Sequence, residues 1–316
     1  MPKPQSSAYT ITLAMLAMVI VPAALTLHTV RVTAFGPTFS ANPSPYGYTV
    51  SLLFFLIPSL AILFWFIPQE RLHFSRRAFA WSVGLLFPIG AALDFFFAHL
   101  FFVFPNPAAT LGIKAPALGG GVPIEEYAFY LLGFMTILLL YIWFDEYWLA
   151  AYTVPALAKE RITFDRLLRF HPASFLLALA LIAGCFVYQR LTPGPPNRFP
   201  GYTLFLIVFA LLPSSALLPT ARPVINWRAL SLTMFLLLVT SLLWEVTLAL
   251  PYGWWNFQSQ QMLGIRITAW DFLPIEEVYL WIAVTYASVI VYEILKRWKA
   301  SGRSARHAFL GRNTAV

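Results

Sequence analysis

Long apolar segments separated by short polar stretches follow one another along the whole chain. Each segment is close to the ~20 residues that a helix needs to cross a hydrocarbon core of about 30 Å. The eight segments are 8–27, 48–67, 79–104, 123–144, 173–189, 202–218, 229–250 and 274–295. The pattern therefore predicts an all-α fold, a polytopic membrane bundle of about eight transmembrane helices.

Composition agrees with this prediction. Hydrophobic residues make up 59% of the chain and charged residues 11%, with a mean hydropathy of +0.72, whereas soluble domains carry about 25% charged residues. The first segment follows Lys3, as the apolar core of a signal peptide would, but it is long enough to span a membrane and no small-residue cleavage site follows it. We therefore interpret it as a helix of an integral membrane protein.

Lysine and arginine are distributed unevenly between the two ends of the predicted helices. With eight crossings, one side holds sixteen of them and the other holds five, which are Arg31, Lys114, Arg190, Arg198 and Arg266. Cytoplasmic loops carry the excess of basic residues, so both termini are expected to be cytoplasmic in a cell (inner) membrane protein. The net charge of +8 then reflects topology and contact with the lipid bilayer, and no nucleic-acid partner is implied.

The chain contains an internal repeat, most visible in its acidic residues. Asp94 precedes Pro-Ile-Glu-Glu at 123–126 by 29 positions, and Glu245 precedes the same tetrapeptide at 274–277 by 29. Gly-Tyr-Thr opens the second segment at 47–49 and the sixth at 201–203. Since each half has an even number of crossings, the two repeats are expected to be parallel in orientation, with a cleft between them.

These repeats divide the chain into four regions. We expect a first four-helix repeat over 1–150 and a second over 173–300. Residues 151–172 mix tyrosine with basic residues, which is typical of an interfacial linker along the lipid head groups. Residues 301–316 are basic, small and polar, which is typical of a disordered tail. The sequence is compatible with a homo-oligomer and does not indicate one.

Acidic residues in or beside the apolar segments are the catalytic candidates: Asp94, Glu125, Glu126, Glu245, Glu276 and Glu277. Proline followed by glutamate also suits an ordinary helix start, where the helix dipole favours a carboxylate. Two copies with an acid upstream favour function, because intramembrane acids are functional by default. Adjacent glutamates project about 100° apart on a helix, so one of each pair can face the cleft while the other braces the helix. Several carboxyls in a poorly hydrated cleft cannot all be ionised, and a protonated one can act as a general acid.

Aromatic residues are dense between Glu245 and Glu276. Their π faces would stabilise a cation, although Trp and Tyr also anchor ordinary helices at membrane interfaces. The candidate substrate-binding residues are Tyr252, Trp254, Trp255, Asn256, Trp270 and Asp271, with Phe104 and Tyr127 in the first half. His99 and Cys185 are interpreted as structural residues. Since neither forms a ligand set with the carboxylates, we expect no metal and no cofactor.

At these residues the chain resembles the integral membrane lycopene cyclases, carotenoid cyclases whose two homologous halves occur fused or as separate subunits and which carry a duplicated PxEE motif. The matching pieces are the two Pro-Ile-Glu-Glu tetrapeptides with Asp94 and Glu245 upstream, and Trp255, Asn256 and Gly264. They cover 45–145 and 200–297. The first half departs from the second, with Phe-Pro-Asn at 104–106 where the second has Trp-Trp-Asn at 254–256.

The resemblance implies a cofactor-free enzyme of the isomerase or intramolecular lyase type, which cyclises an acyclic polyene such as lycopene through a carbocation. It also implies an architecture related to the UbiA-type membrane prenyltransferases. A glutamic acid would protonate a terminal double bond, and a carboxylate would remove a proton after ring closure.

Two alternatives stay open. A carotenoid hydratase or another membrane terpenoid cyclase of the same family would let water or a different nucleophile meet the cation. A proton-coupled transporter would also have intramembrane acids in duplicated halves. The paired acids cluster at one membrane face and none lies at the middle of a predicted helix, which favours the enzyme.

Overall fold

The structure is a computed structural model and describes residues 13, 21, 45–153, 171–195 and 197–310 of the 316-residue chain. Within these residues the fold is a helical bundle with seven helices long and apolar enough to cross a membrane: Gly47–Gln69, Arg76–Phe101, Ile124–Trp148, Pro172–Leu191, Gly201–Ala221, Trp227–Ala249 and Ile275–Ser301. They coincide with seven of the eight predicted segments. The first segment, 8–27, lies almost wholly outside the described residues.

Four of the seven spans combine α-helix with a π-helical turn. The α-helices are α2 (Gly47–Ser51), α3 (Leu53–Ala61), α4 (Ile67–Gln69), α5 (Arg76–Phe101), α6 (Ile124–Trp143), α7 (Pro172–Leu191), α8 (Gly201–Leu206), α9 (Leu212–Ala221), α10 (Trp227–Trp244), α11 (Ile275–Ser301) and α12 (Ala305–Leu310). The π-helical turns are η1 (Ile62–Phe66), η3 (Phe144–Trp148), η5 (Ile207–Leu211) and η6 (Glu245–Ala249). Short 3₁₀ turns are η2 (Pro107–Ala109), η4 (Ala150–Tyr152), η7 (Ser259–Gln261) and η8 (Thr268–Trp270).

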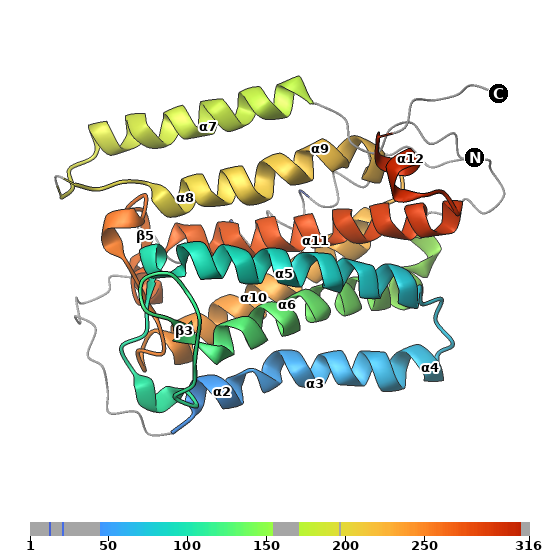
Figure 1. Ribbon diagram of the computed structural model, residues 1–316, viewed down its shortest axis with the longest axis horizontal. Coiled ribbons are helices and arrows are strands. Elements are labelled where there is room, and N and C mark those ends of the chain that lie inside the picture. The colour runs from blue at the N-terminus through green and yellow to red at the C-terminus, as the bar shows by residue number, and fades with distance from the viewer. Residues whose placement is uncertain (1–12, 14–20, 22–44, 154–170, 196, 311–316) are drawn as a thin grey trace.

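Helices α6 and α11 lie at the centre of the bundle and α7 lies at its edge. In the most apolar stretch of each span, 50% of the α6 residues and 56% of the α11 residues are buried, against 11% for α7. Figure 1 shows α7 along one side and α2 to α4 along the other, with α5, α6, α10 and α11 between them. Small buried residues such as Thr285 and Ser288 on α11 allow close packing of the central helices.

Three two-stranded antiparallel sheets lie at one end of the bundle. Strand β1 (Phe102–Val103) pairs with β4 (Asn256–Phe257) and joins the two halves. Strand β2 (Lys114–Ala115) pairs with β3 (Val122–Pro123), and β5 (Arg266–Ile267) pairs with β6 (Leu273–Pro274). Because β3 runs into α6 and β6 runs into α11, the same local structure precedes each Pro-Ile-Glu-Glu tetrapeptide.

The structure differs from the sequence prediction at several element ends. Residues 102–104, assigned to the third segment, leave the helix at Phe101 and form β1 and its loop. The α6 span continues to Trp148, and α11 continues to Ser301. Helix α12 occupies part of the tail for which disorder was predicted. Of the predicted linker 151–172, most residues lie outside the described part of the chain.

The buried core is divided along the bundle. Aliphatic side chains of α6, α10 and α11 fill the part far from the strands, including Ile137, Leu138, Leu230 and Ile290. The part near the strands is mostly aromatic and contains four of the tryptophans: Trp244, Trp254, Trp255 and Trp281. The acidic residues that the sequence analysis selected therefore lie in the aromatic part of the core.

Candidate active site

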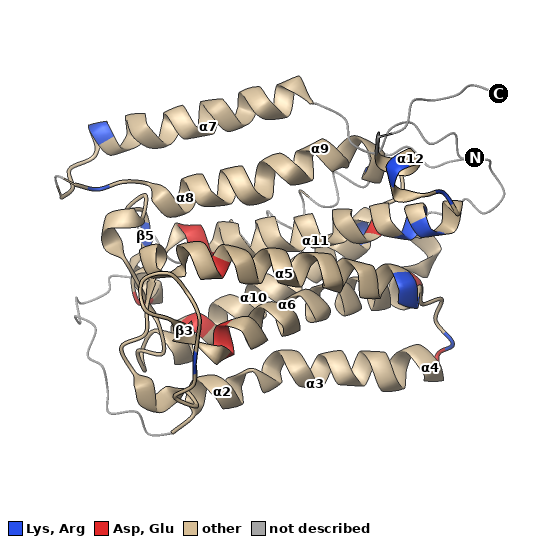
Figure 2. Ribbon diagram, in the orientation of Figure 1, with Lys and Arg blue, Asp and Glu red and all other residues tan. Residues whose placement is uncertain are grey.

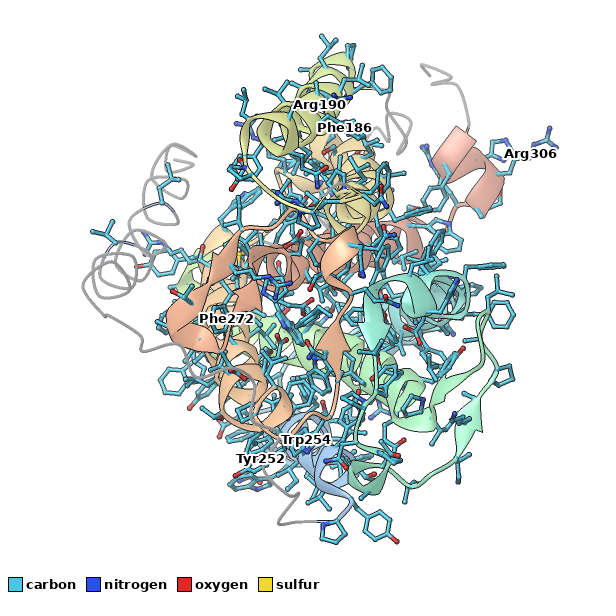
Figure 3. The ribbon with its side chains drawn as sticks, turned by 90° about the vertical axis from the view of Figure 1, so that its left-hand side faces the viewer. Phe186, Arg190, Tyr252, Trp254, Phe272 and Arg306 are labelled. Atoms are coloured by element: carbon cyan, nitrogen blue, oxygen red, sulfur yellow. The ribbon has the colours of Figure 1, made fainter. Side chains whose placement is uncertain are left out.

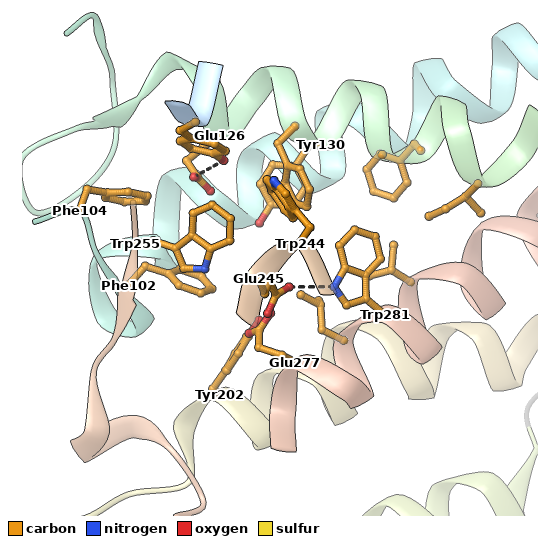
Figure 4. A pocket seen from close by; sticks show the side chains of 17 residues that line it. Phe102, Phe104, Glu126, Tyr130, Tyr202, Trp244, Glu245, Trp255, Glu277 and Trp281 are labelled. Atoms are coloured by element: carbon orange, nitrogen blue, oxygen red, sulfur yellow. Dashed lines mark hydrogen bonds between the residues drawn. The ribbon is translucent and has the colours of Figure 1, made fainter. Parts of the chain in front are cut away.

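A cavity of about 70 Å³ lies inside the aromatic end of the core. Seventeen residues line it (Figure 4), and three of them are acidic: Glu126, Glu245 and Glu277. Ten others are aromatic and the remainder are aliphatic or glycine, so no lysine, arginine or histidine of the described residues lines the cavity. In Figure 2, red ribbon segments that mark acidic positions lie on the central helices toward the end that carries the strands. The site is thus an acidic, aromatic cavity without a compensating cation in its wall.

The start of α6 directs its two glutamates to different places. Glu126 lines the cavity, and the Tyr48 hydroxyl donates a hydrogen bond of 2.6 Å to Glu126 Oε1. Glu125 instead accepts from Thr49 Oγ1 at 2.5 Å and from the Leu111 backbone N–H at 2.7 Å. Glu125 therefore ties α2, α6 and the preceding loop together, while Glu126 is presented to the cavity.

The start of α11 is built in the same way. Glu276 accepts from Thr203 Oγ1 at 2.9 Å and from the Leu263 backbone N–H at 2.6 Å. Glu277 lines the cavity together with Tyr202 and Glu245. Figure 4 shows Tyr202, Glu245 and Glu277 grouped on one side, across from Glu126. The expectation that one glutamate of each pair faces a cleft while the other braces the helix agrees with these contacts.

The two upstream acids differ from each other. Glu245 opens the π-helical turn η6, lines the cavity and accepts a hydrogen bond of 3.0 Å from Trp281 Nε1. Asp94 is buried behind Tyr130, whose hydroxyl lies 3.4 Å from Asp94 Oδ1. That distance is long for an O–H donor. The second half therefore brings two carboxyls to the cavity and the first half brings one.

Glu245 and Glu277 lie beside each other in the cavity wall (Figure 4). Two ionised carboxylates repel each other and neither can donate a hydrogen bond, so this placement favours a proton on one of them. Burying two adjacent anions without a cation is also costly. The pair is consequently suited to hold a proton next to the cavity.

Indole and phenyl rings form the walls between the carboxyls. Trp244 and Trp255 have ring centroids 4.8 Å apart, and Tyr48 lies 5.0 Å from Trp255. On the other side, Phe129 meets Trp281 edge to face at 5.7 Å. Ring faces attract a positive charge, and they also pack against the apolar surface of a hydrocarbon. The walls can therefore hold an apolar molecule that becomes cationic.

Several polar atoms at the cavity have no hydrogen-bond partner among the described residues, namely Glu245 Oε2, Glu277 Oε1 and Trp244 Nε1. A polar cavity of only ~10–15 Å³ is large enough to hold a water molecule, and this cavity is larger. The cavity can therefore hold water when no substrate is present.

The remaining predicted residues lie at various distances from the cavity. Phe104 and Trp255 line it. Trp254 and Tyr252 line a separate apolar groove beside α2, Tyr127 donates to the Pro116 carbonyl, and Asn256 accepts from the Phe257 backbone N–H. Trp270 and Asp271 lie in the turn before β6, where Asp271 has a positive φ of 51° and partial burial raises the pKa of its carboxyl. Apart from Phe104 and Trp255, none of the residues named in this paragraph lines the cavity.

Some lining residues were not among the predicted site residues. Tyr48 and Tyr202 belong to the repeated Gly-Tyr-Thr, which was interpreted only as a helix opening. Tyr130 and Trp281 each follow a cavity glutamate by four positions, one helical turn. Both signals were present in the sequence as repeat-matched aromatic residues at helix-compatible spacing.

No family model, no curated protein and no solved structure matches this chain. Among the described residues, no group of three or more His, Cys, Asp or Glu side chains is placed to hold a metal ion.

Proposed function

We propose that this protein is a membrane carotenoid cyclase of the lycopene type, which closes a ring at the end of an acyclic polyene by proton transfer. One observation carries the proposal: Glu126 and Glu277 line the same cavity, which is otherwise aromatic and aliphatic. An acid and a base on opposite walls of an apolar site can start and end a carbocation reaction. The resemblance of the Pro-Ile-Glu-Glu repeats to the lycopene cyclases supports the same reaction.

The reaction needs no net change in protons or electrons. The carboxyl proton of Glu277 moves to the less substituted carbon of the terminal double bond, whose π electrons form the new C–H bond and leave a tertiary cation on the other carbon. The neighbouring alkene supplies the electron pair of the ring C–C bond, which moves the cation into the ring. A C–H bond beside the cation then gives its electrons to the new double bond, and its proton passes to Glu126.

The contacts of the two carboxyls support this assignment of roles. Glu277 lies against Glu245, and the pair is suited to hold a proton. Glu126 receives the Tyr48 hydroxyl as a donor, and a donated hydrogen bond favours the ionised form of a carboxylate. Glu277 is thus the donor and Glu126 the acceptor in our proposal.

The aromatic walls have two roles in this proposal. They stabilise the cation through their ring faces and exclude water that would convert it to an alcohol. Entry of the polyene end between these rings would require side chains such as Phe104 or Trp255 to move aside. Side-chain movement of this kind is common on ligand binding.

The matched contacts of the halves support the proposed architecture. Thr49 with Leu111 holds Glu125 as Thr203 with Leu263 holds Glu276. We propose two parallel repeats related by a pseudo-twofold axis, in a UbiA-like arrangement within the cell membrane and with both termini cytoplasmic. The positive-inside distribution supports that orientation.

A carotenoid hydratase is the second candidate, favoured by the unpaired polar atoms of the cavity. Glu245 Oε2 and Trp244 Nε1 could retain a water beside the cation, which would then yield a tertiary alcohol in place of a ring. The two functions share the first step and differ in the product.

Expression in a lycopene-accumulating bacterial host, followed by chromatography of the pigments, tests the proposal. Cyclic carotenoids are expected with the wild type and not with Glu277→Gln, while Glu70→Gln, the same change at an exposed acid, keeps wild-type activity. Hydroxylated acyclic pigments would support the hydratase. Unchanged lycopene with a folded wild-type protein would contradict both the cyclase and the hydratase. Proton-coupled flux in vesicles would then be the next measurement.

A further inference from the structure

A second cleft, of about 430 Å³, lies at the end of α7 and its connection to α8. Clefts that bind small ligands commonly measure about 300–1,000 Å³. Four of its lining residues carry hydrogen-bond donors: Gln189, Arg190, Thr192 and Arg198. No acidic residue lines it within the part of the chain that the structure describes. Figure 3 shows Arg190 together with Phe186 at the outer edge of the molecule.

Two donor atoms of this cleft lack acceptors. Arg198 Nε and Gln189 Nε2 are both buried and have no hydrogen-bond partner among the described residues. Arginine side chains carry no acceptor, and a buried donor left unpaired destabilises the fold. A ligand that offers several acceptor oxygens and a negative charge would satisfy all of these groups.

The Arg198 guanidinium is held in place by the backbone around it. Its Nη2 donates to the Leu263 carbonyl. A Cβ at Gly194 would lie 2.7 Å from Arg198 Nη1, and a Cβ at Gly264 would lie 2.4 Å from Arg198 Cζ. Since any larger residue at either position would displace the guanidinium, the chain leaves this space for an arginine head group.

We propose that this cleft binds the phosphate of an anionic phospholipid. Phosphate oxygens only accept hydrogen bonds, and the arginine fork matches their geometry. The apolar surface beside the cleft favours a lipid over free phosphate, because Val187 is 56% exposed and Leu191 is 79% exposed on the adjoining part of α7. Acyl chains would lie along this helix while the head group occupies the cleft.

The lipid site connects to the candidate active site through one residue. The Leu263 carbonyl accepts from Arg198, and the Leu263 backbone N–H donates to Glu276, the neighbour of Glu277. A lipid that orders Arg198 therefore orders the loop that braces the start of α11. The inference stands whether or not the protein is a cyclase, since it concerns lipid binding and stability.

Lipid titration of the purified, delipidated protein tests the inference. Short-chain phosphatidylglycerol or phosphatidylcholine is added, bound lipids are counted by intact-protein mass spectrometry, and the melting temperature is recorded. We expect the wild type to retain one phosphatidylglycerol preferentially and to melt higher with it than with phosphatidylcholine. Arg190→Gln should bind it at least about tenfold more weakly, because a hydrogen bond to a charged group is lost.

The matched control is Arg306→Gln, which removes the same charge from α12, on a different edge of the molecule from Arg190 (Figure 3). It should bind phosphatidylglycerol like the wild type. Equal weakening by both substitutions would mean general attraction to a basic surface and would overturn the site. Full stabilisation by inorganic phosphate alone would overturn the assignment to a lipid.

Discussion

Two neighbouring glutamates on each helix start have different tasks because the helix turns them apart. Glu125 and Glu276 accept a threonine hydroxyl and a backbone N–H, whereas Glu126 and Glu277 line the cavity. Chemistry and folding are therefore separable at adjacent residues. Substitution by glutamine keeps the volume of each side chain and tests that separation.

For the cavity residues we expect a loss of turnover with the fold retained. Glu277→Gln and Glu126→Gln should lower turnover by about 10²–10⁴-fold, the usual contribution of a general acid or base, because the amide cannot transfer a proton usefully. Ring formation per folded protein and the melting temperature are the measurements. Near-normal turnover in both variants would show that these carboxylates only stabilise the helix starts and take no part in the reaction.

For the bracing residues we expect the opposite result. Glu125→Gln and Glu276→Gln weaken hydrogen bonds to a charged acceptor, worth about 1.5–3 kcal/mol each, so melting temperature and folded yield should fall more than turnover per folded molecule. Thr49→Val and Thr203→Val remove the partner hydroxyls and should act in the same direction. A full loss of turnover at unchanged melting temperature would place these carboxyls in the reaction.

The sequence identified the acidic residues as candidates, but it did not show which glutamate of each pair lines the cavity. Adjacent glutamates on a helix must point in different directions. Which way Glu125 points depends on its contacts with Thr49 and Leu111, which are 76 and 14 residues away from it in the sequence. Trp254 and Trp255 are adjacent as well, and only the second lines the cavity. Tertiary contacts decided both cases.

At the level of elements, each half uses the start of one helix to hold the start of another. Tyr48 of α2 donates to Glu126 of α6, and Tyr202 of α8 lines the cavity beside Glu277 of α11 (Figure 4). The repeated Gly-Tyr-Thr sequence thus brings one tyrosine to each half of the cavity wall. Gly47 permits this arrangement in the first half, because a Cβ there would lie 2.7 Å from the Trp254 ring.

Removing the phenolic hydroxyls tests this role. Tyr48→Phe takes from Glu126 the hydrogen bond that favours its carboxylate form, so proton removal should slow by about tenfold, the value of roughly one such bond. Tyr127→Phe, whose hydroxyl binds a backbone carbonyl away from the cavity, is the control and should keep its activity.

The helices were predicted well and the segments between them were not. An apolar run of about 20 residues is a strong and local signal for a spanning helix. The strands are two residues long, and their pairing of Phe102 with Phe257 joins positions 155 residues apart, for which the sequence carries no local pattern. Those strands nevertheless close the end of the bundle where the cavity lies.

At the scale of the whole molecule, the proposed topology fixes which end of the bundle faces the cytoplasm. Cysteine introduced at Ser301, at the end of α11, should label only from the cytoplasmic side, and cysteine at the exposed Gln260 of the η7 turn should label only from the other side. The native Cys185 is buried and should give little background. Labelling of both positions from one side would contradict the proposed span of α11, and labelling of Ser301 from the outer side would contradict a cytoplasmic C-terminus.

The most direct test of acid-initiated cyclisation is isotopic. Purified protein in excess over lycopene is equilibrated in D₂O with a chelator and without flavin or nicotinamide, and the product is analysed by mass spectrometry and NMR. Because the carboxyl proton exchanges with solvent beforehand, the proposal predicts one deuterium for each new ring, on the carbon that the acid protonates. Rings formed without deuterium, or no rings unless a cofactor is added, would contradict it.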